Sequence, residues 1–349
     1  MSSIPAFSLR RWRDAADHER PAIAADFMEM CHGVGFFHLT DHGVADDTID
    51  RYFDLLEAFF ALPTEAKQTI EKSRSRHFRG WESLGSELTN NRVDHREQID
   101  LATENTPWPD DTEPLYLRLD GPNQWPGEDL LPGFRATVTD FLSLMDSLAW
   151  ELMDVMTLGL GLEAGTFRRL FGERPFSLAK LIHYPTTPQG EAGVNPHKDA
   201  GFLTLLLPHG VGGLEALAPD GTWIPADPPP GAFVCNAGEM LQAITGNYVV
   251  AATHRVIAHE RRFSTAYFHG PDLRTSLEPL DLDPRFGEAV AASERHRSAG
   301  FMAKRDELLE GRDGIASASA PCFGQQLWNY YVRSYPDNVA RYYVDAVSR

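Results

Sequence analysis

Residues 195–204 read Asn-Pro-His-Lys-Asp-Ala-Gly-Phe-Leu-Thr, which places the imidazole of His197 two positions before the carboxylate of Asp199. On an extended backbone, side chains two positions apart point to the same face. The apolar and β-branched run at residues 202–207 predicts that a buried strand follows the pair. Gly201, which has no side chain, lets the backbone come close to a ligand. The stretch therefore indicates two metal-binding groups on one face, next to a buried strand.

A third ligand is needed to hold a metal, and His254, in the sequence Thr-His-Arg-Val, is the candidate. Two histidines and one carboxylate on one face of an octahedral ion leave three positions open, an arrangement typical of non-haem Fe(II) oxygenases. A chain with 13 histidines shows about one His-x-Asp by chance, so the strand context is what favours the site at His197. The His-x-Glu at residues 95–97 lies among charged residues, and we interpret it as part of a solvated segment.

The composition restricts the partners of the protein. Its 349 residues include 32 Lys and Arg against 50 Asp and Glu, and the net charge of −18 repels phosphate backbones and anionic membranes. No run approaches the ~18 apolar residues of a membrane span, and the first residues lack the apolar core of a signal peptide. The three cysteines form no CxxC pair, which suits a reducing compartment. We expect a cytoplasmic protein with a small-molecule substrate, and with neither nucleic acid nor a membrane as partner.

Hydrophobic periodicity separates helical from strand-rich parts of the chain. Apolar residues at helical spacing predict helices over residues 18–33, 46–62, 63–72 and 134–158. From residue 178 the period shifts towards 2, and Asp220-Gly221 marks a tight hairpin turn. Seven or eight short strands separated by turn residues suggest a jelly roll, a mainly β core in an α+β chain.

Four parts follow from this pattern: a helical and mixed N-terminal region at 1–130, a long supporting helix at 131–165, a β core at 175–290 and a C-terminal helical arm at 291–349. Residues 77–102 mix aromatic, glycine and charged residues without a period. We expect this segment to be either a functional loop over the scaffold or a surface crossover.

Arg262 and Ser264 share one face of a predicted strand shortly after His254. A guanidinium and a hydroxyl in this arrangement can grip one carboxylate together. The alternative is a surface salt bridge. Because a buried arginine requires a partner, a carboxylate ligand lying between Arg262 and a metal would account for the pair.

Residues 178–270 resemble the catalytic core of the isopenicillin N synthase-like branch of the Fe(II)/2-oxoglutarate-dependent oxygenases. The segments that carry the resemblance are Tyr184-Pro185, residues 197–206, residues 213–217, residues 236–241, His254-Arg255-Val256 and Arg262-Phe263-Ser264, with Gly35-Phe36-Phe37 and Asp41-His42-Gly43 in the N-terminal part. Lys198 stands where that family usually has Thr or Ser, and Glu239 stands where it usually has Asp.

The resemblance implies a double-stranded β-helix and the cofactors Fe(II), 2-oxoglutarate and O2. It places iron on His197, Asp199 and His254. It places the far carboxylate of 2-oxoglutarate on Arg262 and Ser264, and Tyr184 also falls in the 2-oxoglutarate site.

Within that family, residues 268–271 and 331–337 resemble the bacterial ethylene-forming enzyme. The arginine-substrate contacts of that enzyme fall on Glu87 and Arg333, and another of its active-site basic residues falls on Lys180, which we assign to the cofactor site. This resemblance implies a small polar or amino-acid-like substrate. The bland alternative is that Glu87 is a solvated loop charge and that Arg333 lies on a helix surface.

The expected reaction is hydroxylation of the substrate with release of succinate and CO2; desaturation and ring closure are other outcomes of the same chemistry. One alternative is an oxidase that, like isopenicillin N synthase, keeps the metal ligands but uses no 2-oxoglutarate. A second is fragmentation of 2-oxoglutarate to ethylene. A third, from a different class, is a metal-free or sugar-binding β-barrel, which has no need of two histidines and a carboxylate that converge.

Overall fold

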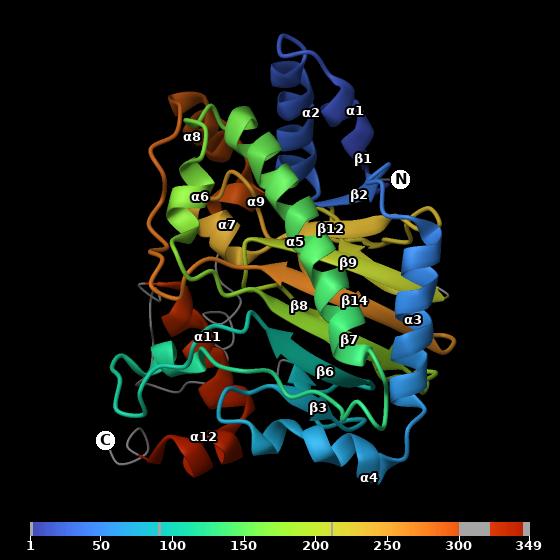
Figure 1. Cartoon of the computed structure of the whole chain (residues 1–349). Coiled ribbons are helices and arrows are strands. Elements are labelled where there is room, and N and C mark those ends of the chain that lie inside the picture. The colour runs from blue at the N-terminus through green and yellow to red at the C-terminus, as the bar shows by residue number, and fades with distance from the viewer. Residues whose placement is uncertain (1–2, 90–91, 211, 300–321, 345–349) are drawn as a thin grey trace.

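The computed structural model describes residues 3–89, 92–210, 212–299 and 322–344, and its core is a pair of β-sheets (Figure 1). The larger sheet has the strand order β1-β2-β12-β9-β14-β7-β6-β3, and the smaller sheet has the order β11-β10-β13-β8. The strands of the larger sheet are β1 Ala6–Ser8, β2 Phe36–Thr40, β3 Gly80–Glu82, β6 Glu97–Ala102, β7 Leu178–Tyr184, β9 Leu203–Gly210, β12 Phe233–Ala237 and β14 Arg262–His269. Those of the smaller sheet are β8 Val194–His197, β10 Leu214–Leu217, β11 Trp223–Pro225 and β13 His254–Val256. A short hairpin, β4 Leu88–Thr89 with β5 Arg92–Val93, forms a separate two-stranded sheet beside β8. This is the double-stranded β-helix, or jelly roll, that the sequence predicts.

The two faces of β14 decide where a site can form. Thr265 on the outer face meets the Tyr52 hydroxyl at 2.8 Å, and Tyr267 on that face donates a hydrogen bond of 2.7 Å to Asp146. Residues 262, 264, 266 and 268 therefore point the other way, into the space between the sheets. Side chains of the inner face can reach a ligand, whereas those of the outer face pack against helices.

Three helices cover the outer face of the larger sheet (Figure 1). They are α2 Arg20–Gly33, α3 Asp46–Phe60 and the long α5 Phe134–Gly159, which crosses the sheet diagonally. Apolar residues of α5 recur at helical spacing and are buried, among them Phe141, Met145, Leu148 and Leu152. No helix among the described residues is long and apolar enough to cross a membrane.

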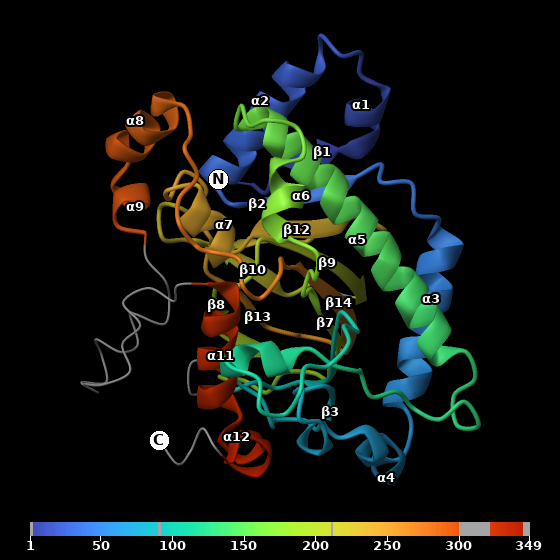
Figure 2. The ribbon, with the colours of Figure 1, turned by 60° about the vertical axis from the view of Figure 1, so that its left-hand side comes forward.

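The C-terminal helices α11 Phe323–Ser334 and α12 Pro336–Tyr342 pack against the end of the sheet that holds β3 and β6 (Figure 2). Asn338 donates hydrogen bonds to the carbonyls of Lys72 and Ser75, and the ring of Tyr331 stacks on Phe78 with the centroids 4.4 Å apart. The remaining helices are short: α1 Leu9–Asp14, α4 Thr64–Lys67, α6 Thr166–Phe171, α7 Glu239–Ile244, α8 Pro284–Ala292 and α9 Glu294–Arg297, with 3-10 turns η1 Gln68–Ile70, η2 Lys72–Arg74 and η3 Leu115–Leu119.

Three expectations for the N-terminal part are wrong. Residues 63–72 form α4 and two 3-10 turns instead of one helix, and this places the ammonium of Lys72 inside the protein. Residues 77–102 are not a single loop, because β3 and β6 join the larger sheet there. The segment at 94–97 is also not solvated, since Asp94 and Arg96 are buried.

The charges of this segment explain the error. Glu97 accepts a hydrogen bond of 2.8 Å from Lys67, and Asp100 accepts one of 2.5 Å from Lys72, so carboxylates on a buried strand are neutralised by lysines from the preceding helical segment. The division of the chain into four parts stays a prediction. The region at 1–130 supplies β1, β2, β3 and β6 to the same sheet as the core.

Candidate active site

His197, Asp199 and His254 converge between the two sheets. β8 and β13 pair in a register that sets His254 directly opposite His197. The Nε2 atoms of His197 and His254 lie 3.6 Å and 3.5 Å from Oδ1 of Asp199. These three ligand atoms all lie within 4.8 Å of one another, so one metal ion can contact all of them.

Both imidazoles are held in the orientation that a metal requires. Nδ1 of His197 lies 2.9 Å from the carbonyl of Asn195, and Nδ1 of His254 lies 3.2 Å from the carbonyl of Ala252. A carbonyl only accepts, so each Nδ1 carries the proton and donates it. The lone pair of each Nε2 then faces the position between the ligands.

The carboxylate of Asp199 is fixed through its second oxygen. Oδ2 accepts hydrogen bonds from the hydroxyl of Thr204 at 2.6 Å and from the amide of Asn236 at 2.7 Å. Oδ1 is the oxygen that faces the two histidines. Asn236 and Thr204 therefore determine which oxygen Asp199 presents to a metal.

The protonation states also fit metal binding. Burial and the neighbouring His254 lower the pKa of His197 to about 3. Burial alone would raise the pKa of Asp199, but the two imidazoles and the hydrogen bonds from Asn236 and Thr204 hold it below its ordinary value. A neutral imidazole and an ionised carboxylate are the forms that bind a metal.

Arg262 and Ser264 lie on the inner face of β14, and both are buried. Nη1 of Arg262 donates to the carbonyl of Gly212 at 3.2 Å. Among the described residues, Nε of Arg262 and Oγ of Ser264 have no hydrogen-bond partner. Buried donors without a partner cost free energy, so the pair fits a carboxylate that both groups would bind. The ring of Tyr184 lies beside them, 5.3 Å from the Arg262 guanidinium.

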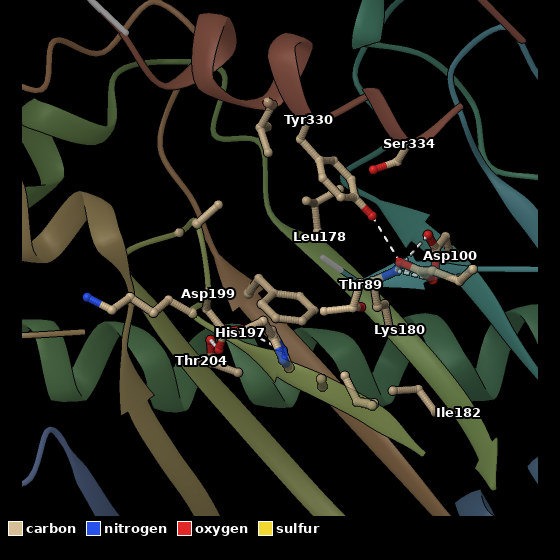
Figure 3. A pocket seen from close by; sticks show the side chains of 18 of the residues that line it. Thr89, Asp100, Leu178, Lys180, Ile182, His197, Asp199, Thr204, Tyr330 and Ser334 are labelled. Carbon is tan, nitrogen blue, oxygen red and sulfur yellow. Dashed lines mark hydrogen bonds and ion pairs between the residues drawn. The ribbon is translucent and has the colours of Figure 1, made fainter. Parts of the chain in front are cut away.

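A cavity of about 280 Å³ opens above the candidate ligands (Figure 3). His197, Asp199 and His254 line it, and Tyr184 lies in its wall as well. Arg262 is found in the wall of a neighbouring cavity, which the loop at residues 227–231 borders. The main cavity therefore extends from the candidate metal position towards α11 and the β4–β5 hairpin.

Glu87 lies in the wall of the cavity and is buried. Its carboxylate meets the ammonium of Lys180 at 3.1 Å, accepts a hydrogen bond of 2.9 Å from Tyr330 and lies 3.4 Å from Nη2 of Arg96. Lys180 also pairs with Asp100 at 3.0 Å, and Figure 3 shows Tyr330 reaching from α11 towards Asp100 and Lys180. The interpretation of Glu87 as a solvated charge is wrong, because the segment folds inward onto these cations.

The same network continues to Lys72, which is 2 % exposed. Its ammonium lies 2.5 Å from both Glu82 and Asp100 and donates to the Tyr335 hydroxyl at 2.7 Å. Glu82, Glu87 and Asp100 are close enough together to resemble a second metal site. Lys72 and Lys180 lie against these carboxylates, so the protein itself supplies the compensating cations.

The structure brings Arg333 to the same cavity and gives Lys180 a role of its own. Arg333 is an exposed residue of α11 that lines the cavity. Lys180 lies on the inner face of β7, but its ammonium is held by Glu87 and Asp100. Its assignment to the cofactor stays a prediction.

Sequence reasoning missed Asn236, Thr204, Asp100 and Tyr330 as site residues. Thr204 and Asn236 lie in segments that carry the family resemblance, but neither was given a role. A buried strand that contains an Asn or an Asp was the available signal, because such a residue requires a partner.

Comparison with known proteins agrees with this geometry. Residues 175–271 match the model of the 2OG-Fe(II) oxygenase superfamily, and residues 4–128 match that of the non-haem dioxygenase in morphine synthesis N-terminal region. A 2-oxoglutarate-dependent dioxygenase of Dothideomycetidae sp. is 33% identical over 316 residues, which cover 88% of this chain and 83% of the relative. The chain belongs to the 2OG-Fe(II) oxygenase superfamily. This oxygenase uses Fe(II) and 2-oxoglutarate.

Two further relatives show the range of the superfamily around this oxygenase. A homoarginine-6-hydroxylase of Glycine max is 31% identical over 298 residues, covering 80% of this chain and 89% of the relative. The structure of a rice dioxygenase for auxin oxidation superposes with a TM-score of 0.63 at 26% identity, covering 89% of this chain and 96% of that one. These relatives are fungal and plant proteins, so the finer likeness to a bacterial ethylene-forming enzyme is not supported by them.

Proposed function

We propose that this oxygenase hydroxylates a small polar, amino-acid-like molecule that carries a cationic group and a carboxylate, and releases succinate and CO2. One observation carries the proposal. The carboxylate of Glu87 and the guanidinium of Arg333 line the same cavity as the three candidate metal ligands. A zwitterion could pair with both groups while its carbon chain passes the metal position.

In this proposal His197, Asp199 and His254 hold Fe(II), and Arg262 with Ser264 holds the far carboxylate of 2-oxoglutarate beside Tyr184. The bound metal and cosubstrate supply the oxygen activation and the oxidative decarboxylation. The protein keeps both imidazoles neutral and oriented, presents one oxygen of Asp199, and keeps the charge of Arg262 out of water. These are the tasks that the chain itself performs.

The charge balance supports a cationic group at the Glu87 end of the cavity. The buried network contains four carboxylates, Glu82, Glu87, Asp94 and Asp100, and three cations, Lys72, Lys180 and Arg96. The carboxylates outnumber the cations of these ion pairs by one, although burial raises the pKa of Glu82 and so favours its neutral form. Burial alone would raise the pKa of Glu87 as well, but Lys180 and Arg96 lower it, so its carboxylate is ionised and is the group that a substrate cation would meet in the cavity wall.

The homoarginine-6-hydroxylase relatives support the same class of substrate, because homoarginine carries a guanidinium and an amino-acid carboxylate. The rice relative, whose name refers to auxin oxidation, favours a different substrate class, an apolar monocarboxylate. We propose the zwitterion because an apolar acid would offer no partner to the ionised carboxylate of Glu87 in the cavity wall. We also propose a cytoplasmic location, in keeping with three free and buried cysteines.

The test is substrate-dependent release of succinate from the Fe(II)-loaded enzyme. Homoarginine, its uncharged isostere homocitrulline, and indole-3-acetate are compared at equal concentration. We expect homoarginine to accelerate succinate release at least tenfold more than homocitrulline, since the two differ in the cationic group. Stimulation by indole-3-acetate alone would overturn the proposal. Ethylene in the headspace gas would instead identify fragmentation of 2-oxoglutarate, and substrate oxidation without succinate would identify the oxidase.

A further inference from the structure

The strand that carries His197 lies at the edge of its sheet. β8 is the last strand of the order β11-β10-β13-β8, and its inner edge pairs with β13. Among the described residues no strand pairs with its outer edge. Backbone groups at such an edge need other partners, and an edge without them moves more easily than a central strand.

The carboxylate of Asp94 meets this outer edge. Its Oδ1 accepts hydrogen bonds from the backbone amide of Asn195 at 3.0 Å and from the side-chain amide of Asn195 at 2.9 Å. The carbonyl of the same Asn195 accepts the proton of Nδ1 of His197 at 2.9 Å. Asp94 therefore contacts Asn195, the residue whose carbonyl orients the ring of His197.

The other oxygen of Asp94 faces the cavity wall. Oδ2 accepts hydrogen bonds from the hydroxyl of Thr89 at 2.6 Å and from Nη2 of Arg96 at 3.0 Å. The same Nη2 atom lies 3.4 Å from Glu87. Thr89, Arg96 and Glu87 all line the cavity, so one carboxylate joins the wall of the cavity to the strand of the ligand.

Asp94 carries a charge that is not needed to satisfy the backbone at the edge of β8. A neutral side chain would satisfy the donors of Asn195, yet this position holds a carboxylate that is 0 % exposed. Burying a charge is costly unless it is paired. Its partner is the guanidinium of Arg96, which also pairs with Glu87. A movement of Arg96 relative to Glu87 therefore changes the hydrogen bond between Arg96 and Asp94.

We propose that Asp94 is a positioning residue that couples the cavity wall at Glu87 and Arg96 to the orientation of His197. Occupation of the Glu87 end of the cavity would then reach the metal through Arg96, Asp94 and Asn195. The inference rests on the assignment of His197 as a metal ligand. It does not depend on which molecule fills the cavity.

Co(II) bound to the apo-protein in place of iron provides a readout other than turnover, because its visible absorption depends on ligand geometry. We expect Asp94→Asn to shift the Co(II) bands and to weaken Co(II) binding about tenfold, the effect typical of losing a group that orients a metal ligand. Glu87→Gln, which is remote from the ligands, is expected to shift the same bands less. In the double variant, Glu87→Gln is expected to cause no shift of the Co(II) bands beyond that of Asp94→Asn, because the two residues act along one path.

The matched control is Glu191→Gln. Glu191 pairs with His95 at 3.4 Å with its side chain 58% exposed, so this change removes a charge near the same segment but outside the path. It should leave the Co(II) bands unchanged. If Asp94→Asn did not fold, Asn195→Ala should give the same shift at smaller size. It keeps the backbone hydrogen bond to Asp94 and removes the side-chain hydrogen bonds to Asp94 and to the carbonyls of Arg92 and Val93.

The experiment distinguishes a failure of the coupling through Asp94 from a failure of the assignment of His197 as a metal ligand. If the wild-type protein bound no Co(II), the assignment of His197 would fail and the inference with it. If the wild type bound Co(II) and Asp94→Asn lowered the melting temperature while matching the wild-type spectrum and affinity, Asp94 would be a structural cap only. Additive shifts from Glu87→Gln and Asp94→Asn would likewise overturn the coupling.

Discussion

Nε2 of His254 lies 3.5 Å from Oδ1 of Asp199, although the two residues are far apart in the sequence. The register between β8 and β13 produces this approach, because it sets His254 opposite His197. The same two strands contribute Val194 and Val256 to the smaller hydrophobic cluster, whereas the three ligand side chains belong to neither hydrophobic cluster. Changes in the ligands can therefore be separated from changes in the fold.

Replacing Asp199 by Ala should abolish Fe(II) binding and turnover while the unfolding temperature stays within a few degrees of wild type. The carboxylate is one of three ligands, and its side chain projects into the cavity and not into the apolar core. Metal titration of the apo-protein and thermal unfolding check both parts. The control is His95→Ala, in the other His-x-acid of the chain, which should keep the iron. Full activity of Asp199→Ala would remove the site as assigned.

Arg262→Gln should raise the KM for 2-oxoglutarate by about 10- to 150-fold, since a hydrogen bond to a charged group contributes roughly 1.5–3 kcal/mol. The KM for the primary substrate should change much less, because Arg262 does not line the main cavity. Arg261→Gln is the matched control: its side chain is 58% exposed and pairs with Glu57 on the surface. An unchanged KM for 2-oxoglutarate in Arg262→Gln would place the cosubstrate elsewhere.

The sequence predicted the parts of the fold that local periodicity determines. The helix at 134–158 corresponds to α5 Phe134–Gly159, and the hairpin around Asp220-Gly221 corresponds to β10 and β11, where Leu217 pairs with Trp223. The candidate metal ligands were identified because a His-x-Asp pair stood beside a buried strand. Each of these signals lies within a few residues of the feature that it predicts.

The cavity wall could not be predicted in the same way. Asp94 was interpreted as part of a solvated segment, and a solvated loop charge was the alternative for Glu87, because the cations that allow such charges to be buried come from distant segments at Lys72 and Lys180. Burial of charge depends on partners that only the folded chain brings together. The extension of the larger sheet by β3 and β6 was missed for this reason.

His77 should make the protein less stable in mild acid. Burial, together with the nearby Arg79 and Arg76, lowers the pKa of His77 to about 4, whereas an unfolded histidine titrates near ~6.5. The unfolded state therefore takes up the proton first, and stability present above pH ~6.5 is lost as the pH falls towards ~4. His77→Asn should make this loss smaller, because an amide can replace the 3.0 Å hydrogen bond to the Arg118 carbonyl without titrating.

Chemical unfolding at several pH values in this window checks the expectation for His77. His18→Asn is the control, since this histidine is exposed in the folded protein. The prediction concerns the difference in pH dependence and not the absolute stability. Parallel curves for wild type and His77→Asn would contradict it.

Lys72→Met should destabilise the protein by about 3–5 kcal/mol, because it leaves Glu82 and Asp100 buried without their shared cation. Arg169→Met removes an exposed pair with Glu163 and should cost less than about 1 kcal/mol. Urea unfolding of both variants measures the two costs. Equal effects would mean that the carboxylates are neutralised in another way.

Glu87→Gln and Arg333→Ala test the selecting end of the cavity. Both residues line it. Arg333→Ala should keep the slow conversion of 2-oxoglutarate to succinate that needs no substrate. Glu87→Gln, which is linked to His197 through Arg96 and Asp94, should change that slow conversion much less than it changes the acceleration by the true substrate. Both variants should lose most of that acceleration. Because Glu87 is buried and Arg333 is exposed, the loss should be larger for Glu87→Gln, about tenfold or more, which corresponds to roughly 1.4 kcal/mol.

The two variants also differ in what a failure would mean. Glu87→Gln keeps the shape of the side chain and its hydrogen bond from Tyr330 while removing the charge, so a loss of acceleration reports on charge and not on packing. Arg333→Lys is the companion to Arg333→Ala: partial recovery by lysine would indicate that a positive charge at the mouth of the cavity is what the substrate requires. If both Glu87→Gln and Arg333→Ala processed the substrate at the parent rate, neither residue would select it. Three other polar residues of the cavity wall, Thr89, Asn329 and Ser334, would be the next to test by the same assay.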